Sequence, residues 1–130
     1  MKILFLEDNL DFADPIIEAA EFLGHTIDFT INISEAVNWF NERTYDAVIS
    51  DVHIKNVNAS LNSGFDFVFH IRKKKKSNIV IAMTTGLELL LEENVKDYGV
   101  DIFYHKPVSI GLVNFIKEIE AKVIERKTSA

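Results

Sequence analysis

Short apolar runs alternate along this chain with longer segments in which apolar residues recur at helical spacing. Four runs are almost continuously apolar, at residues 3–6, 47–50, 79–83 and 102–105. Residues 26–31 instead alternate apolar and polar side chains, which indicates a strand at the edge of a sheet or with one wet face. Strand-length runs separated by helical segments are typical of repeated βα units. The pattern therefore predicts five βα units around one parallel sheet, with the run at 79–83 near its centre.

The first helical segment carries its apolar residues from Phe12 to Leu23 on one face. It stops at Gly24, a residue type favoured just after a helix ends. Pro15 is awkward inside this segment because proline has no N–H to donate. Two possibilities remain: Asp14 is the N-cap with Pro15 at the first helical position, or the first turn is kinked.

Four further helices are predicted. Ser34 is expected to cap the second helix, and the third follows Gly64, which ends a loop over residues 52–64 that is rich in Asn, Ser and small residues. Gly99 closes the fourth helix, and the fifth is expected to fray from Lys127 onward. Apolar residues mark these four helices in turn: Ala36, Val37 and Phe40; Phe65, Val68 and Ile71; Leu90, Leu91 and Val95; Leu112, Phe115, Ile116, Ile119 and Val123.

Length and composition describe one globular domain. The chain has 130 residues, of which 48% are hydrophobic and 26% charged, close to the globular average. We expect residues 1–126 to form the domain and residues 127–130 to be a frayed end or the start of a linker. The lack of cysteine excludes disulfides and Cys-ligated zinc and suits a cytoplasmic protein. No apolar run approaches the roughly 20 residues that span a bilayer.

The net charge of −6 argues against nucleic-acid binding, because affinity for phosphates needs an excess of Lys and Arg. One basic cluster, residues 72–76, interrupts this acidic composition. It can be a contact for phosphate or an anionic surface, or simply the solvated end of a helix, where cations complement the helix dipole. We favour the second interpretation and expect no direct binding of nucleic acid or membrane by this domain.

Polar residues stand where four of the predicted strands end. Glu7 and Asp8 follow the first strand, Asp51 the third, Thr84 the fourth and Lys106 the fifth. The carboxyl ends of parallel strands lie along one edge of a sheet, where α/β proteins bind ligands. Three carboxylates, a hydroxyl and an ammonium group are therefore expected to face one small pocket.

Three carboxylates in one pocket favour a bound cation. Two carboxylates about 4 Å apart repel by roughly 4 kcal/mol at an effective dielectric near 20, so without a cation one would keep its proton. Oxygen ligands without Cys or clustered His favour Mg²⁺, with Mn²⁺ as a substitute. Because phosphate often completes a Mg²⁺ site, Lys106 and Thr84 are candidates to contact a phosphoryl group. A carboxylate can also attack phosphorus and form an aspartyl phosphate.

Each of these elements has a simpler explanation when taken alone. Glu7 and Asp8 can be the acidic pair at a helix N-terminus, and Asp51 after a buried strand is equally ambiguous. Lys106 with Pro107 can simply stop a strand. Their order along the chain and their shared position at strand ends favour one joint site.

Four ordered segments that carry these residues give the chain a resemblance to the receiver domain of two-component response regulators. They are residues 5–9 (Phe-Leu-Glu-Asp-Asn), 47–51 (Ala-Val-Ile-Ser-Asp), 83–86 (Met-Thr-Thr-Gly) and 99–107 (Gly-Val-Asp-Ile-Phe-Tyr-His-Lys-Pro). The resemblance covers essentially the whole chain. It implies a single flavodoxin-like α/β domain with a five-stranded parallel sheet in the order 2-1-3-4-5 and helices on both faces.

The resemblance also implies roles for the acidic residues. Asp51 would accept a phosphoryl group from the phosphohistidine of a histidine kinase or a histidine phosphotransfer protein. Asp8 and Asp51 would bind Mg²⁺ directly, and Glu7 would contribute mainly through water. The backbone carbonyl of His53 would be a further ligand of the ion.

A switch would report this phosphorylation. Thr84 would move to contact the phosphoryl group, Lys106 would pair with it, and Phe103 matches the position of the switch aromatic residue. The bond before Pro107 is expected to be cis. Output to a downstream effector domain or protein would pass through the face of the fourth helix, the fifth strand and the fifth helix.

The loop after Asp51 departs from the family pattern. It has no proline near Lys55 and is several residues longer. Gly86, shortly after Thr84, leaves little side chain to shield or orient a water that attacks the phosphoryl group. His53 is a candidate for either task.

Two other functions stay open beside the phosphorylation switch. An interaction scaffold with this fold that is never phosphorylated is expected to lack an acid, the Thr or the Lys, whereas all are present here. A phosphohydrolase with Asp51 as nucleophile usually has a second Asp two residues later, where this chain has His53. The switch is therefore the leading interpretation.

Overall fold

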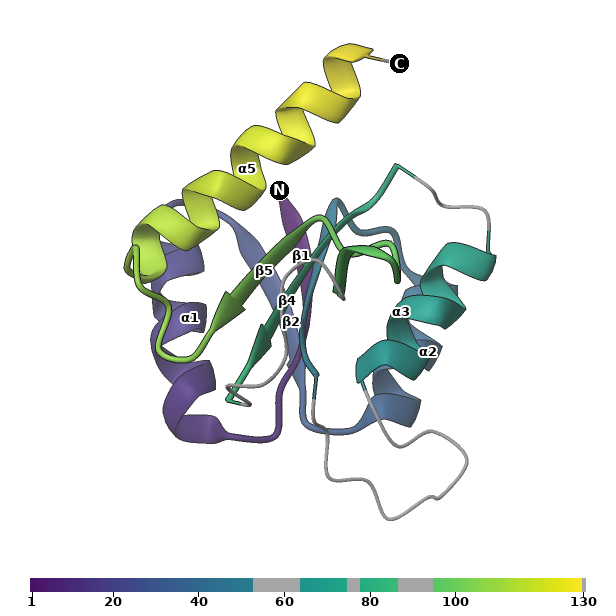
Figure 1. Ribbon diagram of the computed structural model, residues 1–130, viewed down its shortest axis with the longest axis horizontal. Coiled ribbons are helices and arrows are strands. Elements are labelled where there is room, and N and C mark those ends of the chain that lie inside the picture. Colours follow the sequence, from purple (N-terminus) through teal and green to yellow (C-terminus); the bar gives the residue numbers. More distant parts are fainter. Residues whose placement is uncertain (53–63, 75–77, 87–94, 130) are drawn as a thin grey trace.

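The computed structural model describes residues 1–52, 64–74, 78–86 and 95–129. Within these residues, a sheet lies between two layers of helices (Figure 1). The strands are β1 (Lys2–Leu6), β2 (Thr26–Thr30), β3 (Ala47–Asp51), β4 (Val80–Thr85) and β5 (Ile102–His105). The helices are α1 (Leu10–Phe22), α2 (Ile33–Glu42), α3 (Gly64–Lys73) and α5 (Leu112–Ser129). Leu90 and Leu91 of the predicted fourth helix lie outside the described residues, whereas Val95 is described and buried.

The five strands form one parallel sheet in the order β2-β1-β3-β4-β5, which confirms the flavodoxin-like topology. β2 lies at an edge, as its alternating pattern predicts, and the apolar β4 pairs on both sides. α1 and α5 cover one face of the sheet, and α2 and α3 cover the other (Figure 1). In the register, Leu6 pairs with Ser50 and Asp51 with Thr84. The carboxyl ends of β1, β3 and β4 are therefore neighbours.

Alternation of side chains along the strands divides the core in two. Phe5 and Ile49 belong to the cluster that packs against α1 and α5. Their neighbours Leu6 and Val48 belong to the cluster that packs against α2 and α3. All four side chains are fully buried. The residue that directly follows a strand continues this alternation, so the strand determines on which face of the sheet its side chain lies.

α1 begins earlier than its sequence suggests. Asn9 is the N-cap, and its side-chain oxygen accepts a hydrogen bond of 3.0 Å from the backbone N–H of Asp11, so the assignment of Asp14 as cap is wrong. Pro15 lies inside the helix. It is exposed, so water can satisfy the Asp11 carbonyl that loses its intrahelical partner. Gly24 follows the helix with φ +84°, as predicted.

α2 also has a cap that differs from the prediction. The side-chain oxygen of Asn32, not of Ser34, accepts hydrogen bonds from the backbone N–H groups of Ser34 (2.8 Å) and Glu35 (3.2 Å). Both α1 and α2 follow a stretch with several capping-type residues. Which of them becomes the cap depends on where the preceding strand ends and the backbone turns.

A cluster of charged residues surrounds Asp101, which directly precedes β5. It lies at the opposite end of the strands from Glu7, Asp51 and Lys106. The Asp101 carboxylate accepts hydrogen bonds from Arg72 (3.0 Å), from Arg126 and from the backbone N–H of Ile81 (2.8 Å). Arg72 comes from α3 and Arg126 from α5. One carboxylate therefore ties a helix of each layer to the sheet.

α5 runs through Ser129, and the expectation that residues 127–130 form a frayed end or the start of a linker stays a prediction. Arg126 is held by Asp101, and Lys127 Nζ lies 3.1 Å from the Asp46 carboxylate. These contacts bind the last turns to the body of the domain, although the helix reaches past the sheet in Figure 1. No helix among the described residues is long and apolar enough to cross a membrane.

Candidate functional site

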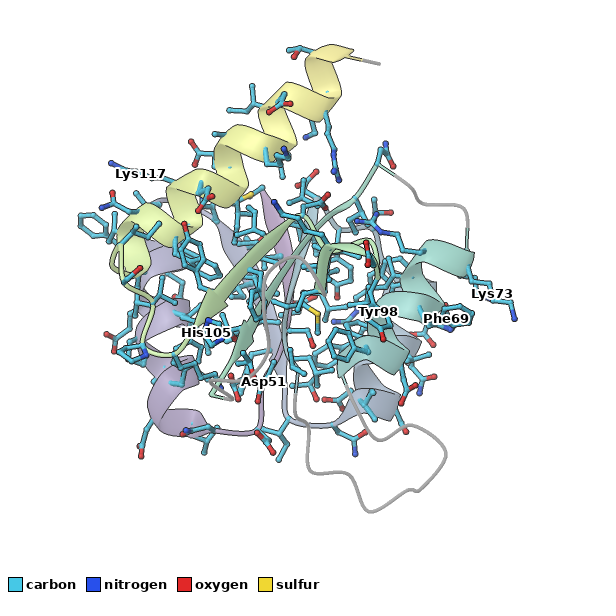
Figure 2. The ribbon with its side chains drawn as sticks, viewed as in Figure 1. Asp51, Phe69, Lys73, Tyr98, His105 and Lys117 are labelled. Carbon is cyan, nitrogen blue, oxygen red and sulfur yellow. The ribbon has the colours of Figure 1, made fainter. Side chains whose placement is uncertain are left out.

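The candidate site lies at the carboxyl ends of β1, β3, β4 and β5, where Figure 2 shows Asp51. By strand alternation, Glu7, Asp51 and Thr84 continue the face that packs against α1 and α5. Glu7, Asp51 and Thr84 are buried, whereas Asp8 is half-buried. The fold therefore gathers these strand-end residues, as the sequence predicts.

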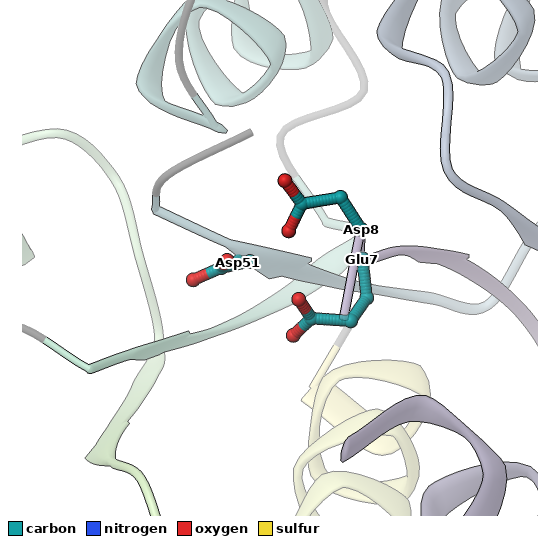
Figure 3. A group of neighbouring side chains, drawn as sticks. All are labelled: Glu7, Asp8 and Asp51. Atoms are coloured by element: carbon teal, nitrogen blue, oxygen red, sulfur yellow. The ribbon is translucent and has the colours of Figure 1, made fainter. Parts of the chain in front are cut away.

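The three carboxylates converge (Figure 3). One oxygen from each of Glu7, Asp8 and Asp51 lies within 4.8 Å of the others. A set of carboxylate oxygens alone is the donor type that hard divalent cations prefer. The residues present thus fit a magnesium site, in which two of the three carboxylates, those of Glu7 and Asp51, also face a lysine.

That lysine is Lys106, which faces two acids at once. Its Nζ lies 2.7 Å from Glu7 Oε1 and 3.4 Å from Asp51 Oδ2. The ammonium also lies 4.4 Å from the centroid of the Phe12 ring, a distance at which the ring face attracts a cation. The backbone N–H of Lys106 donates to the Thr85 carbonyl at 2.7 Å, and the bond to Pro107 is cis, the form that the resemblance implies.

Burial and charge act on Glu7 in opposite directions. Burial raises the pKa of Glu7, the hydrogen bond from Lys106 lowers it, and the negative charge of Asp51 raises it again. The backbone N–H of Asn9 also donates to Glu7 Oε2 at 3.1 Å. Burial dominates, and the pKa of Glu7 rises to about 7. In the metal-free protein, the pocket therefore favours the protonated form of Glu7 more than water does.

Thr84 and Phe103 are the residues to which the resemblance assigns the switch. Thr84 is fully buried, and its hydroxyl oxygen has no hydrogen-bond partner among the described residues. Phe103 is buried on the opposite face of the sheet, and its ring meets that of His105 edge-on at 5.2 Å. The proposed ligand carbonyl of His53 and the loop position Lys55 lie outside the described residues.

Comparison with known proteins identifies the family of this chain. The family model described as "Response regulator receiver domain" matches residues 3–117, which is most of the chain. The chain belongs to the response regulator receiver domain family. It is therefore a receiver domain of two-component signalling, which is a signalling domain and not a classical enzyme.

Solved receiver domains share the fold of this one. The CheY-like receiver domain protein from Methanospirillum hungatei matches with a TM-score of 0.84 and 19% identity, covering 99% of this chain and 98% of the other. A receiver domain protein from Clostridium thermocellum matches with a TM-score of 0.80 and 21% identity, covering 99% and 98%. At these identities the likeness is one of fold.

One curated relative is much longer than the part of it that this chain matches. Probable histidine kinase 1 of Oryza sativa subsp. indica is 26% identical over 136 aligned residues, which cover 83% of this chain. The match spans only 14% of the length of that kinase. The likeness thus concerns a receiver segment and carries nothing about the rest of the kinase.

Three features of the receiver site were not predicted from the sequence. Phe12 contacts the Lys106 ammonium, Asn9 donates to Glu7, and Gly64 packs against the backbone of Asp51. The position of Asn9 directly after Asp8 offered a signal, since capping residues often follow a strand. Phe12 and Gly64 lie in other segments, and their contacts arise only when the chain folds.

Glu7 gives a prediction about the metal-free receiver domain. Because its pKa is raised from 4.5 to about 7 on folding, the folded state binds the proton more tightly. That stabilisation is complete below pH 4.5 and is lost as the pH rises through about 7, and it amounts to about 3 kcal/mol. In EDTA, urea unfolding should show stability falling from pH 5 to pH 8 more steeply in the wild type than in Glu7→Gln.

Added Mg²⁺ should reverse much of this loss at pH 8, because a cation compensates the ionised carboxylates. Equal slopes for the wild type and Glu7→Gln in EDTA would show that Glu7 titrates normally. The difference between the two proteins isolates the contribution of Glu7, because every other ionisable side chain is present in both.

Proposed function

We propose that Asp51 is the phosphoacceptor of a phosphorylation-dependent switch. The observation that carries the proposal is the position of Lys106, whose ammonium lies between Glu7 and Asp51 at 2.7 and 3.4 Å. A phosphoryl group on Asp51 would add negative charge beside an ammonium that is already in place. Thr84 pairs with Asp51 in the sheet register, and its hydroxyl has no hydrogen-bond partner in the described ranges of the chain, which supports the same assignment.

In the proposed reaction, a carboxylate oxygen of Asp51 attacks the phosphorus of a phosphohistidine. The new O–P bond forms as the N–P bond breaks, and the leaving imidazole keeps the electron pair and takes up a proton. The donor would be a histidine kinase or a histidine phosphotransfer protein. Lys106 would then pair with a phosphoryl oxygen, and slow hydrolysis would return Asp51 to its carboxylate.

Mg²⁺ would be held by Asp8 and Asp51 directly and by Glu7 through water, with the His53 carbonyl as a further ligand. When bound, the ion neutralises charge on the phosphoryl oxygens. The described residues contribute the carboxylate oxygens that are gathered within 4.8 Å. Their convergence supports this assignment, and Mn²⁺ is expected to substitute because it shares the preference for oxygen ligands.

Output is proposed to start at Thr84. A phosphoryl oxygen would accept the hydrogen bond that the buried Thr84 hydroxyl lacks among the described residues, and this would draw the end of β4 toward Asp51. The backbone of β4 is bonded to the Lys106 segment through Thr85. The shift would reach Phe103 and the face formed by the helix containing Val95, β5 and α5, which would contact an effector.

Acetyl phosphate labelling tests the proposal. The wild type should gain one phosphoryl group per chain by intact-mass measurement, and the label should require Mg²⁺ and vanish in EDTA. Asp51→Asn should remove the label, because an amide is not a nucleophile for phosphorus. Asp97→Asn, at an exposed carboxylate in the turn before β5, is the matched control and should label normally.

Retention of the label in Asp51→Asn would refute the assignment of the phosphoacceptor. A wild type that binds neither Mg²⁺ nor beryllofluoride would instead favour an interaction scaffold that is never phosphorylated. Multiple turnover of a small phosphate ester would favour the phosphohydrolase.

A further inference from the structure

α3 and the turn before β5 each carry an exposed aromatic residue. The side chain of Phe69 is 68% exposed and that of Tyr98 is 56% exposed. Phe65 connects them, because its ring lies 4.6 Å from that of Tyr98 and it precedes Phe69 by one helical turn. Figure 2 shows Phe69 and Tyr98 on this side of the molecule. Together, Phe65, Phe69 and Tyr98 form what we call the aromatic strip.

The aromatic strip is fixed in place by a backbone contact. Arg72 of α3 donates from Nε and Nη2 to the Gly99 carbonyl, at 3.0 and 2.6 Å. Gly99 has φ +85°, and a Cβ there would meet the Arg72 side chain at 3.0 Å. The turn that carries Tyr98 is therefore clamped against α3. A preformed surface costs less conformational entropy when it binds a partner.

Positive charge adjoins one end of the strip. Lys73 follows Phe69 by one helical turn and is exposed, and Lys74 comes next. Both lysines lower the pKa of His70, in addition to the larger effect of its burial. The C-terminal end of α3 is thus a region of positive potential in a chain whose net charge is −6. This region would attract an acidic partner and speed its association.

We propose that the aromatic strip and Lys73 dock a segment of a partner protein that carries an apolar anchor next to acidic residues. The anchor covers Phe65, Phe69 and Tyr98, and the acidic residues lie toward Lys73. Charge argues for this occupant over a second copy of the chain, because a symmetric dimer through this face would bring the lysines of both copies together. It also argues against an anionic membrane, because a broad surface would face the exposed Asp97 beside Tyr98 as well as Lys73, whereas a short segment can place its acidic residues at Lys73 alone.

This surface is separate from the site at Asp51 but adjoins the proposed output face, because the backbone N–H of Tyr98 donates to the Val95 carbonyl at 3.0 Å. Its contacts come from α3 and the turn at Tyr98 and Gly99, and they involve none of the proposed metal or phosphoryl residues. Docking can therefore be measured on the unphosphorylated domain, apart from the chemistry at Asp51.

The test uses the whole domain and a short fluorescein-labelled peptide with a Trp-Leu anchor followed by a run of glutamates. Fluorescence anisotropy should show saturable binding that weakens as salt is raised. Phe69→Ala should weaken binding at least about tenfold, as expected for an aromatic anchor. Lys73→Glu should weaken it about tenfold at low salt and less at high salt.

Matched controls come from the other face of the molecule. Phe22→Ala removes a phenylalanine that is 81% exposed at the end of α1, and Lys117→Glu reverses an exposed lysine of α5 that Figure 2 labels. Neither should change peptide affinity by more than about twofold. A peptide with lysines in place of the glutamates should not bind.

Several outcomes would overturn the proposal. They are the absence of saturable binding to the wild type, equal losses in Phe69→Ala and Phe22→Ala, and equal losses in Lys73→Glu and Lys117→Glu. Binding to phosphatidylserine-containing vesicles that is lost in Phe69→Ala, without peptide binding, would assign the surface to membranes instead. A Phe69-dependent dimer in sedimentation would assign it to self-association.

Discussion

Gly64→Ala is expected to destabilise the receiver domain by about 3 kcal/mol or more and to strongly reduce phosphorylation of Asp51. A Cβ at position 64 would lie 2.0 Å from the Asp51 carbonyl oxygen and 2.9 Å from the end of the Met83 side chain. Met83 can rotate away, but the backbone of Asp51 cannot, since β3 is paired on both sides. The start of α3 would have to move away from the phosphoacceptor strand.

This movement would also break a hydrogen bond. The backbone N–H of Gly64 donates to the Val52 carbonyl at 2.8 Å, and the Val52 N–H donates to the Thr84 carbonyl at 3.0 Å. A displaced Gly64 would therefore disturb Val52, which follows Asp51 in the chain and is hydrogen-bonded to Thr84. We expect the damage to appear in the site as well as in global stability.

Urea unfolding and acetyl phosphate labelling of the same samples measure both effects. Gly86→Ala is the matched control, because nothing lies within 4 Å of a Cβ at Gly86, although this glycine follows β4 beside the site. It should change the free energy of unfolding by less than about 1 kcal/mol. If Gly64→Ala were as stable and as readily labelled as Gly86→Ala, the close approach at Asp51 would be wrong.

Asp101→Ala is the second substitution expected to have a large effect, a loss of about 3 kcal/mol. It would leave the guanidinium groups of Arg72 and Arg126 facing each other without their shared carboxylate. It would also remove the acceptor for the backbone N–H of Ile81. The side chain of Asp101 is 12% exposed, so water can replace these interactions only in part.

The free energy of unfolding in urea measures this loss. Lys127→Ala is the control, because it removes the neighbouring ion pair with Asp46, in which the lysine side chain is 66% exposed. An exposed pair contributes little, so this variant should lose less than about 1 kcal/mol. Equal effects of the two substitutions would mean that the Asp101 cluster is no stronger than a surface ion pair.

Neither the Asp101 cluster nor the contact between Gly64 and Asp51 was predicted from the sequence, because both join residues that are far apart in the chain. The apolar runs predicted the strands and their parallel pairing, because the periods of strands and helices are properties of neighbouring residues. The prediction that β2 lies at the edge was confirmed for the same reason. Capping was predicted less well: Ser34 was chosen where Asn32 forms the cap, and Asp14 was one of two possibilities where Asn9 forms the cap.

The sequence by itself determined the five strands of a parallel sheet and the residue types at the strand ends, and the resemblance to receiver domains implied the order of the strands. The sequence pattern brings Glu7, Asp8, Asp51 and Lys106 to one edge because parallel strands all end there. Tertiary structure decided how these groups pair: Lys106 lies closer to Glu7 than to Asp51, and Phe12 lies beside its ammonium. Such distances depend on side chains from segments far apart in the chain. They follow from packing, which no local period encodes.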